Sequence, residues 1–275
     1  MARILAVSSQ VARGHVGLSA IVPACQALGH DVIALPTILL SNHPGHDRAA
    51  GEHVSPSLLA RMLETLDANG WLTGIDVVLT GYLPSAEHVA FAARAASVVR
   101  TRSPGVVLLC DAILGDEPKG LYIAQEAAAA IRDMLLPVAD IVKANAFEAR
   151  WLTGAPLVCA DDVGATAATS GWRELIVTSM PGNVPGRLAN IWTGSVGASA
   201  LVEVGERAGV PKGTGDLLSG LVAARLTSAS PGAAVDRSEI LTRAVADLER
   251  VIAASVGHDE LQLVPKLRGL QAGRP

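Results

Sequence analysis

Short, nearly continuous apolar runs recur along the chain up to residue 180, and longer amphipathic segments lie between them. Runs of this kind that are rich in β-branched residues predict strands buried on both faces. They lie at residues 3–7, 31–36, 76–80, 105–110, 140–144 and 174–179. Between them, apolar residues recur at the period of a helix. The helices are expected at 17–29, 55–69, 85–102, 123–136, 145–153 and 159–170.

This alternation of strands and helices predicts an α/β fold of three layers, with a central, mostly parallel sheet between two layers of helices. The pattern changes after residue 180, where the segment 181–186 has the composition of a turn. Two antiparallel strands and two helices are then expected, at 187–194, 198–206, 214–228 and about 236–256. Since no linker or repeat interrupts this order, we interpret residues 1–275 as one domain.

Composition and charge exclude several classes of protein. Half of the residues are hydrophobic, which is enough for a sizeable core, and the net charge of −4 gives no basic surface for a nucleic acid. The first apolar stretch is too short for a signal peptide or a membrane span, and no longer one follows. Cys25, Cys110 and Cys159 show no paired spacing, which is typical of a reducing compartment. We therefore expect a soluble, cytoplasmic protein that binds neither membrane nor nucleic acid.

Polar residues gather where the predicted strands end. In open parallel sheets, ligands bind outside the carboxyl ends of the strands, so these positions are candidates for a site. They are Ser8, Ser9, residues 37–47, Gly81, Tyr82, Asp111, Asn145, Thr178 and Ser179.

The stretch GTGD at 213–216 is the sharpest candidate for chemistry. Gly213, Thr214 and Gly215 precede an apolar helix, so their backbone N–H groups can converge on an anion with the helix N-terminus behind them. Such an anion hole suits a phosphoryl group in transfer, and Asp216 can accept the proton of an attacking hydroxyl. The alternative is an ordinary glycine turn with an acidic residue at a helix start.

The stretch NAFE at 145–148 has two interpretations that do not exclude each other. Asn145 and Glu148 can hold hydrated Mg²⁺ over the phosphates of a nucleotide, and the same pair is a capping-box pattern. Asp111 directly after a strand is either a metal or phosphate-site group or a turn former.

Two further features are weaker. His43, His46 and Asp47 allow a zinc site, but they lack a fourth ligand, so a mobile loop that touches a substrate is the preferred interpretation. Lys212 beside GTGD either attracts a phosphate or is a solvated lysine.

Taken together and in order, these motifs resemble the pyridoxal kinases of the ribokinase-like superfamily over nearly the whole chain. GTGD and N-x-x-E mark the superfamily, whereas the first-strand phrase, the SNH loop and the TGY turn indicate the pyridoxal branch. The phrases are SSQVARGHVG (8–17), LSNH (40–43), LTGY (79–82), CDAILGD (110–116), NAFE (145–148), IVTS (176–179) and GTGD (213–216).

The resemblance implies a ribokinase-like fold, a homodimer, and transfer of the γ-phosphoryl group of ATP to the 5′-hydroxyl of pyridoxal, pyridoxine or pyridoxamine. Mg²⁺ is implied as cofactor, and use of a monovalent cation such as K⁺ is left open. Asp216 matches the catalytic base, and Gly213, Thr214 and Gly215 match the anion hole. ATP contacts are implied for Asp111, Asn145, Glu148, Thr178, Ser179, Lys212, Gly213 and Gly215, with Asp111 and Glu148 as metal residues. Vitamer contacts are implied for Ser9, Val16, His43, Tyr82, Tyr122 and Asp216.

The chain departs from the family pattern at three places. Gln10 stands where the family has His, Pro44 replaces a Thr in the SNH loop, and Lys143-Ala144 replaces Thr-Pro before Asn145. Two alternatives stay open: a related kinase of another small alcohol such as hydroxymethylpyrimidine, and a pyridoxal phosphate binder without activity. The pyrimidine kinases often carry Cys in place of Asp216, which counts against the first, and an intact Asp216 counts against the second.

Overall fold

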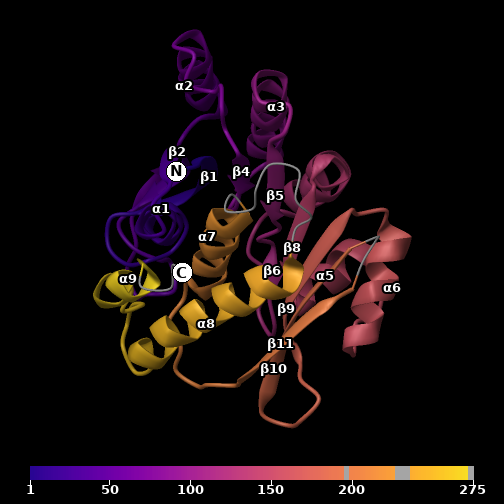
Figure 1. Ribbon diagram of the computed structural model, residues 1–275. Coiled ribbons are helices and arrows are strands. Elements are labelled where there is room, and N and C mark those ends of the chain that lie inside the picture. Colours follow the sequence, from indigo (N-terminus) through magenta and orange to yellow (C-terminus); the bar gives the residue numbers. More distant parts are fainter. Residues whose placement is uncertain (195–197, 227–235, 272–275) are drawn as a thin grey trace.

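A nine-stranded sheet forms the centre of the computed structural model, which describes residues 1–194, 198–226 and 236–271 (Figure 1). Its strands follow the order β11-β10-β9-β8-β5-β4-β1-β2-β3, and six adjacent ones, from β9 to β2, are parallel. Antiparallel strands complete both edges. The strands are β1 (Arg3–Val11), β2 (Asp31–Leu40), β3 (Gly51–His53), β4 (Val77–Thr80), β5 (Val107–Asp111), β8 (Ile141–Asn145), β9 (Glu174–Pro181), β10 (Arg187–Gly194) and β11 (Ala200–Gly205).

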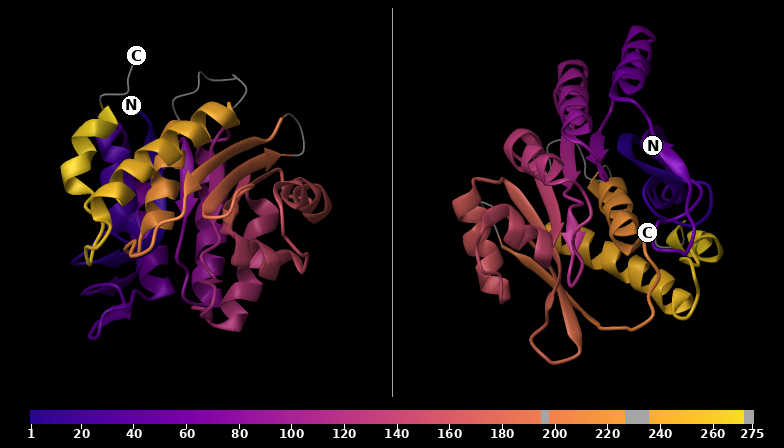
Figure 2. Two further views of the ribbon diagram at one scale, coloured as in Figure 1. Left: turned by 90° about the horizontal axis from the view of Figure 1, so that it is seen from below. Right: turned by 180° about the vertical axis from the view of Figure 1, so that it is seen from behind.

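Helices cover both faces of the sheet, as the alternating pattern predicted (Figure 2). One layer packs on strand residues such as Val7, Leu108 and Val142, and contains α2 (Pro56–Ala68), α3 (Ala86–Arg102), α4 (Gln125–Ala130), α5 (Ala146–Thr153) and α6 (Ala160–Ser170). The other packs on residues such as Ala6, Leu109 and Ile141, and contains α1 (Leu18–Ala27), α7 (Thr214–Leu226), α8 (Arg237–Ser255) and α9 (Val264–Gln271).

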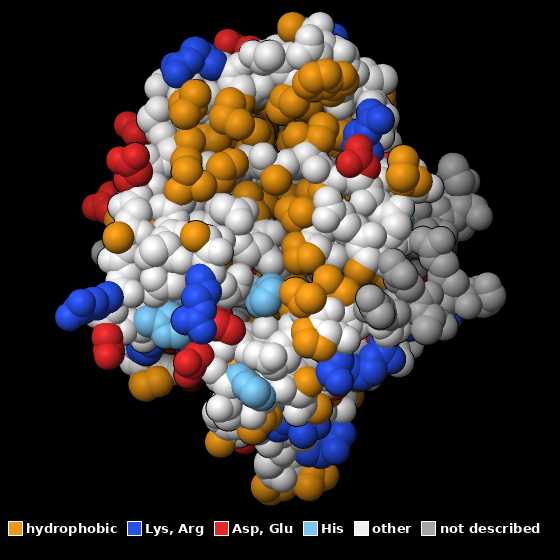
Figure 3. Space-filling view, turned by 90° about the vertical axis from the view of Figure 1, so that its left-hand side faces the viewer, with side chains coloured by type: hydrophobic (Ala, Val, Ile, Leu, Met, Phe, Trp, Pro, Cys, Tyr) orange, Lys and Arg blue, Asp and Glu red, His pale blue; other side chains and the backbone are white. Residues whose placement is uncertain are grey.

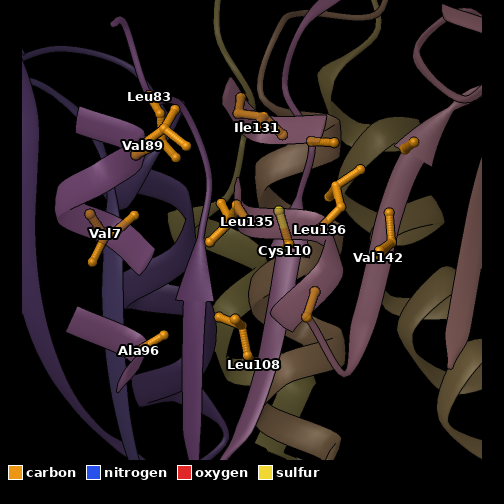
Figure 4. Packing of buried hydrophobic residues seen from close by; sticks show 14 of the residues in the cluster. Val7, Leu83, Val89, Ala96, Leu108, Cys110, Ile131, Leu135, Leu136 and Val142 are labelled. Atoms are coloured by element: carbon orange, nitrogen blue, oxygen red, sulfur yellow. The ribbon is translucent and has the colours of Figure 1, made fainter. Parts of the chain in front are cut away.

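Successive side chains of the central strands point to opposite faces of the sheet, so each strand contributes residues to both hydrophobic cores. Leu108 and Cys110 of β5 point to the first layer, where Figure 4 shows them beside Leu135 and Leu136, while Leu109 between them belongs to the second core. A strand buried on both sides needs an apolar residue at nearly every position, which explains the continuous runs in the sequence.

The predicted strands and helices are all present, with shifted ends. The largest difference is in β1, which runs to Val11 and therefore includes the polar residues Ser8, Ser9 and Gln10. Its pairing with β2 is irregular between Ser8 and Gln10. The helix expected at 123–136 is divided into α4, a π-helical turn at Ile131–Leu135 and a 3₁₀ turn at Leu136–Val138. Residues 227 and 228 of the helix expected at 214–228 lie outside the described residues.

Four elements were not predicted. They are β3, α9 and the two strands of a small hairpin, β6 (Gly115–Asp116) and β7 (Gly120–Leu121). In the described part of the chain, the helices lack the length and apolar character that crossing a membrane requires.

Next to the edge of the sheet, β2 and α2 leave an apolar groove open to solvent (Figure 3). Ile33 and Ala34 of β2 line it together with Leu58, Met62 and Leu66 of α2. Helix α2 therefore has Leu58 and Leu66 on this open surface and Leu63 in the core.

Leu63 and Leu58 give a matched test of the core. Leu63 is 1% exposed and Leu58 is 40% exposed. Leu63→Ala should lower the free energy of unfolding by about 2–5 kcal/mol, because it removes buried methyl groups and leaves a cavity. Leu58→Ala, in the same helix, should change it by no more than about 0.5 kcal/mol. Urea unfolding measures both, and equal losses would contradict the assignment of Leu63 to the core.

Candidate active site

Two glycine-bearing stretches from opposite ends of the chain meet beside α7. Gly213 has a φ of 103° and lies against the backbone of residue 15, where a Cβ would overlap the His15 carbonyl oxygen. Gly17 has a φ of 55°, and a Cβ on it would overlap the carbonyl oxygen and the side chain of Ser9. Only glycine allows both the positive φ and the close approach. The loop after β1 and the GTGD loop therefore form one surface.

Asp216 lies in the first turn of α7, partly exposed, and the backbone N–H of Gly17 donates a hydrogen bond to its carboxylate. Burial raises the pKa of Asp216 to about 6, the Asp111 carboxylate adds to the rise, and the Gly17 N–H and the Lys143 ammonium oppose it. A carboxylate with this pKa is ionised at neutral pH and is still basic enough to take a proton from a hydroxyl.

The backbone amides around Asp216 are also suited to chemistry on an anion. α7 begins at Thr214, so the N–H groups of Thr214, Gly215 and Asp216 lie in its first turn, where an α-helix offers them no carbonyl partner. The helix dipole places partial positive charge at the same point. This arrangement can bind an anion and stabilise charge that develops on it.

A buried ion pair lies beneath this turn. Lys143 Nζ donates to Asp111 Oδ2 at 2.8 Å, and Ser219 Oγ of α7 donates to the same oxygen at 2.5 Å. The ion pair links β5 and β8, on which Asp111 and Lys143 are direct neighbours in register, and the Ser219 hydroxyl extends the link to α7. Asp111 is thus a buried, paired carboxylate and not a turn former at the surface, and its role in a site stays a prediction.

Asn145 and Glu148 form the capping box at the start of α5. Asn145 Oδ1 accepts from the Glu148 N–H at 2.9 Å, and Glu148 Oε2 accepts from the Asn145 N–H at 2.7 Å. Glu148 Oε1 accepts two more backbone N–H groups, from Leu114 and Gly115. Burial and the nearby Asp111 raise the pKa of Glu148 to about 7, against these hydrogen bonds and the charge of Lys143.

These contacts limit how Mg²⁺ fits. Three of about four acceptor positions on Glu148 are used, and Oδ2 of Asp111 is held by Lys143 and Ser219. The acceptor positions that remain on the two residues fit contacts with water molecules around a hydrated ion. Among the described residues, no three His, Cys, Asp or Glu side chains are grouped to hold a metal, so the zinc alternative at His43 and His46 has no support.

The remaining ATP candidates lie on neighbouring elements. Thr178 is the register partner of Asn145, and Ser179 after it has a left-handed φ of 59° in an exposed position, which is unusual for a residue with a Cβ. Lys212 forms an exposed ion pair with Asp116 of the β6–β7 hairpin at 3.2 Å. Tyr122, a candidate for contact with the vitamer, follows this hairpin, and burial together with Asp116 raises its pKa.

The vitamer candidates surround the end of β1. Val16 is buried and Ser9 is half-buried. Tyr82 is half-buried, and its backbone N–H donates to Ser8 Oγ at 3.0 Å while its carbonyl accepts from Thr37 Oγ1 at 2.8 Å. These bonds fix the TGY turn against β1 and β2.

The SNH loop is tied down by residues that the sequence did not reveal. His46 Nε2 lies 3.0 Å from Glu260 Oε1, and Glu260 also packs against Gly14. Burial, and next the charge of Lys212, lower the pKa of His43. The loop therefore lies beside the approach to GTGD. No sequence motif pointed to Glu260, because it lies in an irregular stretch before α9.

Comparison with known proteins agrees with this geometry. Residues 16–258 match the model of a kinase family, phosphomethylpyrimidine kinase. A pyridoxine/pyridoxal/pyridoxamine kinase of Bordetella bronchiseptica is 33% identical over 270 residues, 96% of this chain and 94% of that one. A pyridoxal kinase of Actinobacillus succinogenes is 30% identical over 99% of this chain and 96% of its own.

Solved structures agree as well. Pyridoxal kinase from Leishmania donovani, in complex with ADP and pyridoxamine, aligns with a TM-score of 0.89 and 26% identity over 98% of this chain and 95% of its own. The fold and the family model define this chain as a ribokinase-like kinase of the phosphomethylpyrimidine kinase family. Within that group, the chain belongs to the pyridoxal kinase family.

The contact between the two loops can be tested with one methyl group. Gly213→Ala should lower kcat by about tenfold or more, since the loop must move away from His15 and displace the amides around Asp216. Gly154→Ala is the matched control, because Gly154 also has a positive φ, 67°, but nothing lies within 4 Å of its Cβ position. The control should lose stability and keep its kcat. Equal kcat losses in both variants would contradict the specific role of the contact.

Proposed function

We propose that this chain transfers the γ-phosphoryl group of ATP to the 5′-hydroxyl of pyridoxal, and accepts pyridoxine and pyridoxamine as further substrates. The observation that carries the proposal is the joining of the first-strand loop to Asp216 through the Gly17 N–H, which brings the candidate base and the candidate anion hole close to the half-buried Ser9 at the end of β1. The relatives named above, which are kinases of these vitamers, support the choice of substrate.

In this mechanism Asp216 accepts the proton of the 5′-hydroxyl while the oxygen of that hydroxyl forms a bond to the γ-phosphorus of Mg·ATP. The bond between that phosphorus and the oxygen it shares with ADP breaks, and ADP leaves. The backbone N–H groups of Gly213, Thr214, Gly215 and Asp216 stabilise the negative charge on the transferring group. Each of these donors is held in place before the reaction, which is what makes such stabilisation effective.

Mg·ATP enters as the second substrate. We propose that Thr178, Ser179 and Lys212 contact its phosphates, and Asn145 and Glu148 would hold water molecules of its metal ion. The ADP complex of the Leishmania donovani relative supports a nucleotide as the second substrate. Asp111 is proposed to act on the nucleotide site indirectly, through its contacts with Lys143 and Ser219.

The pyridine ring is proposed to lie against Val16 and Tyr82, with Ser9 and His43 as hydrogen-bond partners and Tyr122 over the site. Gln10, where the family has His, donates its side-chain amide to Ser19 Oγ of α1 at 2.7 Å and to the Val11 carbonyl at 3.2 Å. The substitution therefore changes how β1 is tied to α1. Pro44 is exposed in the SNH loop and lacks the hydroxyl and the N–H of the usual Thr.

Three further properties complete the proposal. Residues 1–275 act as one kinase domain, the protein works in the cytoplasm, and it forms a homodimer. The family resemblance supports the dimer, and the unpaired cysteines support a reducing compartment.

The experiment that tests the function is a substrate panel with Mg·ATP. Pyridoxal, pyridoxine, pyridoxamine and hydroxymethylpyrimidine are compared by mass spectrometry of the phosphorylated product and by ADP release. Pyridoxal should give a kcat/KM at least about tenfold above that of the pyrimidine. Preference for hydroxymethylpyrimidine would establish the alternative that the family model's own description favours, and binding of pyridoxal phosphate without any turnover would establish a binder.

Asp216→Ala tests the base. Loss of a general base should lower kcat by about a hundredfold to ten-thousandfold, with a modest change in KM for pyridoxal. Asp161→Ala is the control, since Asp161 is an exposed aspartate in the first turn of α6. Near-normal kcat in the Asp216 variant would exclude the assigned role.

A further inference from the structure

Lys143 is a buried lysine in the middle of the sheet. Its side chain is 4% exposed, and it stands on β8 next to Asp111 of β5 in the parallel register. Leu109 and Ile141, two residues before each, face the layer that contains α7, so Asp111 and Lys143 point to that layer too. A lysine is almost never this deeply buried unless its charge is paired.

The ammonium lies directly beneath the anion hole. Its Nζ is 3.7 Å from the point that a Cβ on Gly215 would occupy. Ser219, one turn further along α7, donates to Asp111 Oδ2 at 2.5 Å and lies 3.1 Å from the Gly215 carbonyl. Lys143, Asp111 and Ser219 thus form a closed set of contacts between two central strands and the first turn of α7.

The charge of the same ammonium acts on three acidic groups. Asp111 is its direct partner, and its charge also acts on Asp216 and Glu148. Burial is the main cause of the raised pKa of both Asp216 and Glu148; Asp111 adds to it and Lys143 opposes it in each. Without Lys143 this cluster holds three carboxyl groups at the place where a phosphoryl group must arrive.

We propose that the Lys143 ammonium is a fixed internal cation that balances Asp111, Glu148 and Asp216 behind the anion hole, so that phosphoryl transfer by this chain needs no bound monovalent cation. Lys143 is a positioning residue, because it acts through Asp111 and the first turn of α7. Its Nζ and the Ser219 hydroxyl both bind Oδ2 of Asp111, so a positive charge already lies beside this carboxylate.

The internal cation is expected in this chain because of the residue at position 143. The related pattern has Thr at position 143, a shorter side chain without charge. Lys143→Thr therefore removes the ammonium, leaves room beside Asp111, and places there a residue that the fold accepts. This variant should acquire the cation dependence that the wild type lacks.

The experiment compares kcat for pyridoxal phosphorylation in KCl, methylammonium chloride and choline chloride at equal ionic strength. The wild type should change by less than about twofold between the salts. Lys143→Thr should lose at least about tenfold in choline chloride and recover most of it in KCl or methylammonium chloride. Lys266→Thr, at an exposed lysine of α9, should behave as the wild type.

A second measurement does not depend on turnover. A cation that binds the folded variant stabilises it, so KCl should raise the thermal midpoint of Lys143→Thr relative to choline chloride and leave that of the wild type unchanged. A wild type whose kcat depends on K⁺, or a Lys143→Thr variant that is equal in all three salts, would overturn the inference. If the variant does not fold, the wild-type salt series alone decides.

The inference rests on the proposed function, and the two can fail separately. A wild type that phosphorylates no vitamer in any salt contradicts the function, and with it the role of Lys143. A wild type that phosphorylates pyridoxal only with KCl contradicts the role of Lys143 alone.

Discussion

The close approach of the GTGD loop to the loop after β1 is the constraint on which the site depends. A backbone carbonyl of residue 15 lies where any side chain at 213 would begin, and the N–H of Gly17 holds the carboxylate of Asp216. Both stretches are therefore rich in glycine for one reason: two segments of backbone must come into contact while their polar groups remain available. This contact places the loop that follows the first strand against the start of α7 near the end of the chain.

The buried charges beneath that contact follow from the sheet. Parallel pairing of β5 with β8 puts Asp111 and Lys143 side by side, and α7 crosses above them with Ser219. Burying an ion pair is costly, and removing one partner costs about 3–5 kcal/mol because the other charge is left alone. A hydrophobic pair would serve the core as well. The placement of this pair under the first turn of α7 is better explained by its effect on Asp216 than by stability.

Much of the fold could be predicted from the sequence because the central strands are buried on both sides. Such strands read as continuous apolar runs, and the polar residues that follow them mark the end of the sheet where ligands bind. GTGD and NAFE could be found for the same reason, since their local structure, a helix start after a tight turn or strand, is set by neighbouring residues. The capping box of Asn145 and Glu148 was one of two interpretations, and the structure contains it.

The rest depends on contacts that no local pattern records. β3, β6 and β7 are two or three residues long, too short for any periodicity. The ion pair of Lys143 with Asp111 requires the order and register of the strands, and that of His46 with Glu260 joins two irregular segments far apart in the chain. Each is a result of tertiary packing, and sequence analysis could identify Lys143 only as a departure from the family pattern.

Asp216, held by Gly17 and balanced by buried charges, is proposed to accept the proton of the substrate. The pH dependence of kcat/KM for pyridoxal in the wild type tests it most directly, because this parameter reports the ionisation of the free enzyme. A carboxylate with a pKa of about 6 must be ionised to act as a base, so kcat/KM should be level above pH 7 and fall about tenfold per pH unit below pH 6. A profile that stays flat from pH 7 down to pH 5 would contradict the claim.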